Sequence, residues 1–191
     1  MPATIPDNMP VTLAEAKAHL RVTHDQADTE ILGYLLAAIE YAEVRCQRIF
    51  RQRELTMVLS DFPGTDSPIE FDLSPIISAD TIQYYDTDNA TQTLTTAYLV
   101  EDATGISCLV PDYETEWPGT AIRPDAVTIT YTAGYATAAL VPQRAKQAIL
   151  LLTKHGYDQR DPVIIGTGSK ELELSVVSMI RSLKPGNYPR T

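Results

Sequence analysis

The spacing of hydrophobic residues changes twice along this chain. Near both ends they recur at helical intervals, as in Ile31, Leu35 and Ile39, whereas the middle consists of short runs rich in Thr, Val, Ile and Tyr. Helical intervals predict amphipathic helices, and short β-branched runs between turn residues predict strands. The 191-residue chain is therefore expected to be an α+β protein. In it, N- and C-terminal helices form a small helical bundle, with an antiparallel β-rich insert between them.

The N-terminal arm carries the pattern of two helices. Thr12 and Glu15 form a capping-box sequence, in which the Thr hydroxyl and the Glu carboxylate each accept a hydrogen bond from a backbone N–H at the helix start. Asp25 or Asp28 is expected to cap a second, longer helix that runs to about Phe50. Both helices present one apolar stripe, which requires a partner surface.

The C-terminal arm is expected to contain two more helices. Pro142 suits the first position of a helix that continues to about Tyr157. Ser175 is expected to cap a short last helix, which Pro185-Gly186 ends. Neither arm has enough apolar surface to bury its helices alone, so the two arms are expected to pack against each other.

Between the arms, six short runs are expected to form an antiparallel sheet or a small sandwich. Turn sequences such as Asp86-Thr87-Asp88-Asn89 separate these runs. The expected division is a helical core formed by residues 1–53 and 140–191, with the β-rich insert at residues 54–139. The predicted strands are Leu55–Leu59, Ile69–Leu73, Thr81–Tyr85, Leu94–Val100, Ile106–Val110 and Ala126–Tyr131.

Charge distinguishes the insert from the arms. Residues 54–125 include fourteen acidic residues and one basic residue, Arg123, whereas the two flanks carry eleven acidic and fourteen basic residues. Such an insert cannot bind a phosphate backbone by counterion release, which requires Lys and Arg. The acidic residues at alternate positions, Asp112, Glu114 and Glu116, are expected on the solvent face of strands.

No catalytic, cofactor or metal site is expected. The segment Gly166–Lys170 resembles a phosphate-binding loop, but its glycines and lysine do not have the Walker spacing. Cys46 and Cys108 have no CxxC motif and no histidine at ligand spacing, so both are expected to be buried thiols. Trp117 and the tyrosines of the insert lack basic neighbours and are expected to serve core packing and subunit contacts rather than base stacking.

The sequence predicts no association with a membrane. No apolar run approaches the ~20 residues that a spanning helix needs. The segment Met1–Pro10 has neither a basic nor an apolar region typical of a secretory signal. We therefore expect the protein to be made in the cytoplasm of its host.

Three segments together resemble the head–tail connector family of long-tailed phages and prophages, which includes the gp6-like and phiE125 gp8-like proteins. The first segment contains a helical sequence of the form I-L-x-Y-L-x-A-A-x-E-Y-A-E-x-x-C. The second joins a Tyr-Thr-Ala-Gly-Tyr sequence to the third predicted helix, and the third is the last helix with its basic residues. In order, the segments are Pro10–Val22 with Ile31–Cys46, Tyr131–Tyr135 with Val141–Tyr157, and Ser175–Lys184.

The resemblance implies a structural virion protein rather than an enzyme, with no cofactor. Proteins of this family form a ring beneath the portal, complete the DNA channel and offer a platform to later neck or tail proteins. The implied partners are other copies of the chain in a dodecameric ring, the portal and a tail-side connector. DNA is expected to pass through without specific binding. The implied location is the neck of the virion, at the head–tail interface.

Two sets of contact residues are expected. The segment from about Ser169 onward is expected to dock on the portal, as in the family, and the helical arms are expected to form the ring. Acidic inserts would repel one another in a ring, so they are expected to lie outward or to meet a basic surface on the portal or tail side. The portal candidates are Lys170, Arg181, Leu183, Lys184, Tyr188 and Arg190, and the ring candidates are Leu32, Leu36, Tyr41, Arg45 and Arg48.

Two other functions stay open at this point. An assembly module outside the virion would use the β-rich insert as a binding face. A DNA-packaging enzyme, such as a two-metal nuclease, would use clustered carboxylates of the insert around ions ~3.5–4 Å apart.

Overall fold

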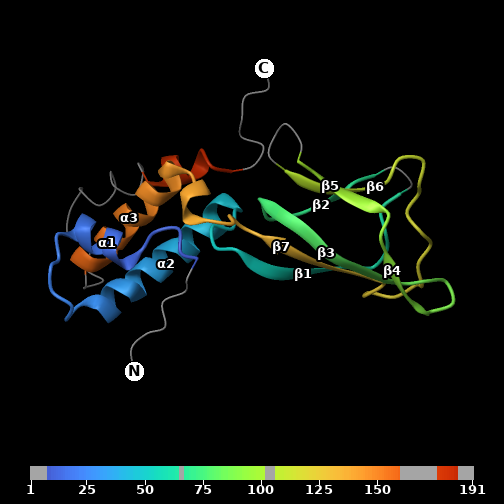
Figure 1. Cartoon of the computed structure of the whole chain (residues 1–191), viewed down its shortest axis with the longest axis horizontal. Helices are drawn as coiled ribbons and strands as arrows, with labels where there is room; N and C mark the ends of the chain where they lie inside the picture. Colours follow the sequence, from blue (N-terminus) through green and yellow to red (C-terminus); the bar gives the residue numbers. More distant parts are fainter. Residues whose placement is uncertain (1–7, 65–66, 102–105, 160–175, 185–191) are drawn as a thin grey trace, which may run out of the picture. The chain divides into compact units, whose positions relative to one another are not determined.

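The structure is a computed structural model that describes residues 8–64, 67–101, 106–159 and 176–184. The chain divides into two compact units (Figure 1). The helical unit comprises Met1–Arg51 and Tyr135–Thr191, and the insert unit comprises Gln52–Gly134. The sequence had placed these boundaries at 53/54 and 139/140. The predicted α+β class, with helices at both ends and antiparallel strands between them, is confirmed.

Helix α1, Leu13–Leu20, begins where the capping box predicts. The Glu15 N–H donates to the Thr12 hydroxyl (3.2 Å), and the Thr12 N–H donates to the Glu15 carboxylate (2.7 Å). The hydrogen bond from the Thr12 backbone holds the pKa of Glu15 below its ordinary value, because it stabilises the ionised form. Arg21 ends the helix in the left-handed conformation, with φ 60°.

Helix α2, Asp28–Cys46, lacks the predicted side-chain cap at its start. Its N-cap residue is Ala27, which makes no capping hydrogen bond through its side chain. The carboxylates of Asp25 and Asp28 lie 2.6 and 2.7 Å from the Lys17 ammonium instead. The capping prediction was therefore wrong, since both candidate carboxylates bind a cation of α1.

The end of α2 also differs from the prediction, because the helix stops at Cys46 rather than near Phe50. Gln47 takes the left-handed conformation, with φ 54°. The buried carboxylate of Glu43 then accepts hydrogen bonds from the N–H groups of Phe50 (2.7 Å) and Arg51 (3.2 Å). These bonds satisfy buried backbone donors that no longer have a helical partner.

The C-terminal arm completes the helical unit. A 3-10 turn, Ala138–Leu140, precedes α3, Gln143–Asp158, and residues 176–181 are helical. The predicted cap Ser175 and the predicted stop Pro185-Gly186 lie outside the described residues. Packing of α3 against α2 confirms that the two arms share one core (Figure 1). That core includes Val11, Ile31, Leu35, Ile39, Phe50, Ala145, Ile149, Val176 and Ile180.

The insert unit contains two antiparallel sheets (Figure 1). The larger sheet has the strand order β1 (Arg53–Leu59), β7 (Val127–Ala133), β3 (Ile76–Tyr85) and β4 (Thr91–Leu94). The smaller sheet has the order β2 (Ile69–Glu70), β6 (Ser107–Pro111) and β5 (Ala97–Glu101). The last strand of the unit, β7, therefore lies between the first and the third along the chain.

Alternation along β7 determines which face of the larger sheet is buried. Val127 and Tyr131 are buried, and the threonines between the buried positions are partly exposed. Aromatic rings fill the interior. The Phe71 ring lies 4.7 Å from that of Tyr131, and Phe62 stacks on Trp117 with 5.0 Å between ring centroids. The expectation that Trp117 belongs to the core is thus confirmed.

Several predictions for the insert were wrong. The predicted strand Ile69–Leu73 forms only β2, Ile69–Glu70, and the predicted strand Thr81–Tyr85 begins earlier, at Ile76. The run Leu94–Val100 forms parts of two strands in different sheets, β4 and β5, because Thr95 and Thr96 break the extended backbone. Three acidic residues after β6 do not alternate along a strand, since Glu114 is left-handed, with φ 59°. Alternate spacing predicts a strand only where the backbone finds a partner to pair with. These three residues are Asp112, Glu114 and Glu116.

Two helical glycines give opposite expectations for substitution by alanine. A Cβ at Gly156 in α3 would lie 2.8 Å from Tyr34 Cδ1, so Gly156→Ala is expected to lower the free energy of unfolding by about 1–3 kcal/mol through overpacking. A Cβ at Gly33 in α2 would meet nothing within 4 Å. Gly33→Ala is therefore expected to raise the free energy of unfolding by about 0.5–1 kcal/mol. Urea unfolding followed by helical circular dichroism measures both, and equal effects of the two changes would contradict the expectation.

Candidate functional site

Arg48, which follows the end of α2, is hydrogen-bonded just beyond the terminal helix, residues 176–181. The Arg48 guanidinium donates to the carbonyl oxygen of Leu183 (2.5 Å) and to the Tyr135 hydroxyl (3.4 Å). A cation at the last carbonyls of a helix is favoured by the helix dipole. Val176 and Ile180 of the same helix are each 2% exposed in the core, and Leu183 packs against that core. Residues 176–184 are therefore packed against the core of the helical unit.

A pocket of about 140 Å³ opens between the end of α2 and the terminal helix. Its cations are Arg45, Arg181 and Lys184, and its apolar walls are Val177 and Ile180. The Arg45 Nε lies 3.4 Å from the Tyr41 hydroxyl, and its guanidinium is 5.7 Å from the centre of that ring. No carboxylate of the described residues lines the pocket.

A second, wider pocket of about 410 Å³ lies between α3 and the terminal helix. It is lined by Gln143, Arg144, Gln147, Ser178, Met179 and Ser182. None of these six residues was singled out from the sequence. In the sequence, three of them are recognisable only as polar residues near the start of the third predicted helix: Gln143, Arg144 and Gln147.

The structure places the predicted contact residues on fewer surfaces than expected. Arg45, predicted for the ring, shares a pocket with Arg181 and Lys184, predicted for the portal. Leu32 is 3% exposed, so its side chain belongs to the core of the chain itself and not to its surface. The remaining predicted residues are Leu36, partly buried against the core; Tyr41, 41% exposed; Arg48 and Leu183, which bind each other; and Lys170, Tyr188 and Arg190, outside the described residues.

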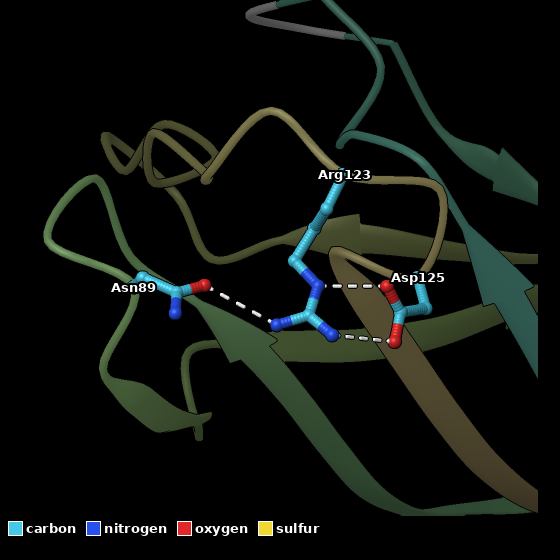
Figure 2. A network of polar contacts seen from close by, with 3 residues as sticks. All are labelled: Asn89, Arg123 and Asp125. Carbon is cyan, nitrogen blue, oxygen red and sulfur yellow. Dashed lines mark hydrogen bonds and ion pairs between the residues drawn. The ribbon is translucent and has the colours of Figure 1, made fainter.

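In the insert unit, Arg123 holds a network of polar contacts (Figure 2). Its guanidinium donates two hydrogen bonds to the Asp125 carboxylate, both 2.7 Å, and one to the Asn89 side-chain oxygen, 3.2 Å. It also lies 3.7 Å from the centre of the Tyr85 ring. The hydrogen bonds from Arg123 hold the pKa of Asp125 below its ordinary value. This cation therefore joins the β3–β4 hairpin to the segment that leads into β7.

The chemistry of the described residues does not resemble a catalytic centre. Among residues 8–64, 67–101, 106–159 and 176–184, no group of three or more His, Cys, Asp or Glu residues could hold a metal ion. Cys46 and Cys108 are free and buried, as predicted. Burial raises the pKa of the Cys46 thiol to about 11, which makes it a poor nucleophile. No helix of the described residues is long and apolar enough to cross a membrane.

Comparison with known proteins identifies the family. Residues 10–109 match the family described as phage gp6-like head-tail connector protein. The chain belongs to this family. The head–tail connector is thus a structural protein and not an enzyme, as its sequence predicted. No curated protein matches the chain.

Solved structures with the same fold come from gene transfer agent (GTA) particles. One is a chain from the virion of a native GTA particle, with TM-score 0.74 and 20% identity. Others are chains from the neck of an empty GTA particle computed with C6 symmetry (0.73, 21%) and from the neck of a native particle computed with C12 symmetry (0.72, 20%). Each alignment covers 99% of the connector chain and 96% of the other chain.

Replacing Arg123 tests its role in the insert unit. Arg123→Ala is expected to speed amide hydrogen exchange in the hairpin around Asn89 and in the segment before β7, because the shared cation is lost. Arg123→Lys keeps the charge but not the two parallel hydrogen bonds to Asp125, so an intermediate effect is expected. Unchanged exchange in both segments after Arg123→Ala would show that the network does not hold them together.

Proposed function

We propose that this connector forms a ring in the neck of a phage-like particle, below the portal, where it extends the DNA channel and supports the tail-side neck proteins. The observation that carries the proposal is the family match, which covers α1, α2 and most of the insert. The GTA neck chains support it, because they share the fold over almost the whole chain and their necks were computed with sixfold and twelvefold symmetry.

The charge distribution is compatible with a channel through which DNA moves. Residues 54–125 contain one cation, Arg123, and its guanidinium is bound to Asp125 and Asn89 within the chain. A surface that offers few cations gains little from counterion release and does not retain a phosphate backbone. In the proposed ring, the insert therefore offers DNA no specific binding surface.

The position and copy number of the connector in purified particles test the ring. Mass spectrometry is expected to find twelve copies for each portal ring, and electron microscopy is expected to place them as one ring in the neck. The physical reason is that a head-to-tail contact repeated around an axis closes at a fixed number of copies. A single copy outside any ring, or no copy in tailed particles, would overturn the proposal.

The C-terminal segment is the proposed portal contact. Lys170, Tyr188 and Arg190 lie in it beyond the described residues, and Leu183 leads toward it from the terminal helix. Arg181 and Lys184, the other proposed portal contacts, line a pocket together with Arg45.

Deletion of residues 185–191 tests the portal contact. The shortened connector is expected to be captured less by portal-containing heads, because two of the proposed contacts, Tyr188 and Arg190, are removed. A control in which both are replaced by Ser at full length separates their side chains from the length of the tail. Normal capture of the truncated chain would show that this tail is not needed for docking.

A further inference from the structure

The larger sheet of the insert unit has two unlike edges. Strand β4 is short and polar, whereas β1 extends over seven residues and pairs only with β7 among the described strands (Figure 1). Edge strands are usually protected against pairing with another chain by short length, lysine, proline or a β-bulge. From Leu55 to Leu59, β1 contains no charged residue and no proline, and its register with β7 is unbroken. This edge is therefore unprotected.

Hydrogen bonds on either side of β7 determine which backbone groups of β1 point outward. The Gly134 N–H donates to the Pro75 carbonyl at 2.9 Å. At the other end, the Tyr85 N–H donates to the Ala126 carbonyl, also at 2.9 Å. Backbone direction alternates along a strand, so even-numbered residues of β7 face β3 and odd-numbered residues face β1. Odd-numbered residues of β1 lie opposite the latter, and the even-numbered ones direct their N–H and C=O groups away from the sheet: Glu54, Thr56 and Val58.

The smaller sheet has a second free edge at β5, which pairs only with β6 among the described strands. The Asp112 N–H donates to the Thr96 carbonyl at 2.9 Å, so even-numbered residues of β5 face β6 and odd-numbered residues face outward. The side chains of Tyr98 and Val100 are 50% and 40% exposed, and that of Val58 on β1 is 53% exposed. Each edge thus combines outward backbone groups with exposed apolar side chains.

We propose that, in the ring, β1 of one copy pairs with β5 of the next, so that neighbouring copies share one continuous sheet. This inference rests on the ring proposed above. Addition of a strand to an exposed edge satisfies backbone donors and acceptors on both chains. The contact is head-to-tail, because the two edges belong to different sheets of the same unit. A contact of this type closes into a ring when it is repeated around an axis.

Antiparallel pairing covers the exposed apolar side chains of β5. Residues whose backbone groups face each other lie directly opposite in an antiparallel pair, and opposite residues share one face. Tyr98 and Val100 therefore lie on the same face as the odd-numbered residues of β1. Those residues are apolar and only half-buried at the open edge, so the new strand removes further apolar surface from water: Leu55, Met57 and Leu59.

Charge does not oppose the contact along the paired segments. Residues 54–125 carry fourteen acidic residues, but Leu55–Leu59 and Ala97–Val100 are uncharged. The flanking carboxylates, Glu54 and Glu101, lie opposite each other in only one register. A shift of two residues separates them and keeps the same faces together. A second copy is favoured over a different neck protein, because the chain carries both edges and a ring supplies each β1 with one β5.

Proline substitution tests the β1 edge in assembled necks of the full-length protein. Thr56→Pro removes an N–H that points away from β7, so the hydrogen bonds between β1 and β7 are kept. The number of connector copies per portal-containing head is expected to fall about tenfold or more, since an acceptor on β5 is left without its donor.

Thr93→Pro is the matched control at the opposite edge of the same sheet. The Asp86 N–H donates to the Ala90 carbonyl at 3.0 Å, so even-numbered residues of β4 face β3 and the Thr93 N–H points outward. This variant is expected to leave the copy number unchanged. Circular dichroism and thermal unfolding of the isolated variants confirm that both are folded.

The β5 edge is tested through its side chains. Tyr98→Thr with Val100→Thr keeps β-branched residues in the strand but removes the apolar cover, and is expected to lower the copy number as Thr56→Pro does. The control is Tyr113→Thr with Ile122→Thr, which changes two exposed apolar residues outside the strands and is expected to have no effect.

Hydrogen exchange of the unmodified protein provides a measurement that does not depend on any variant. Exchange in residues 54–59 is expected to be slower in assembled necks than in the isolated chain, because the outward N–H groups of β1 gain acceptors. Unchanged exchange in this segment would overturn the proposal.

The remaining outcomes separate this contact from other occupants and from the ring itself. Loss at only one of the two edges would assign that edge to another neck protein or to the chain's own termini, and would overturn the proposal. Normal copy numbers in both edge variants, or equal losses in the controls, would overturn it as well. Absence of the unmodified connector from necks is a different result, which would remove the ring and with it this contact.

Discussion

The structure of this connector depends on the packing of two helical arms that are far apart in the chain. Ile31, Leu35 and Ile39 of α2 are completely buried, and Ala145 and Ile149 of α3 are part of the same core. An amphipathic helix of this length is stabilised mainly by burial of its apolar face, which neither arm achieves alone. The helical unit therefore forms only when the chain returns after the insert. The pocket between the end of α2 and the terminal helix exists only in that packed state.

Polar contacts within the helical unit engage several of its cations. Arg48 is used inside the unit, where it binds the end of the terminal helix, and Lys17 binds two carboxylates near the start of α2. Arg45, Arg181 and Lys184 line one pocket. Residues 54–125 carry fourteen acidic residues and one basic residue, Arg123, whereas the flanks carry eleven acidic and fourteen basic residues.

Local patterns predicted the elements well where the deciding interaction is itself local. The capping box at Thr12 and Glu15 was confirmed, since both partners lie within one helical turn. The end of α2 was not predicted, because it depends on the bonds of the buried Glu43 to residues that follow the helix. The two strands within Leu94–Val100 were read as one, because only pairing with β3 and with β6 separates them.

The sequence by itself determined the class of fold, the helical or extended character of most segments, the segregation of charge and the family, since each is carried by residue type and spacing along the chain. The tertiary structure decided which side chains meet. It buried Leu32, used Arg48 inside the helical unit and united Arg45 with Arg181 and Lys184, which are more than a hundred residues away. Such neighbours depend on how α2 and the terminal helix pack, and that packing is chosen by the whole core rather than by any local pattern.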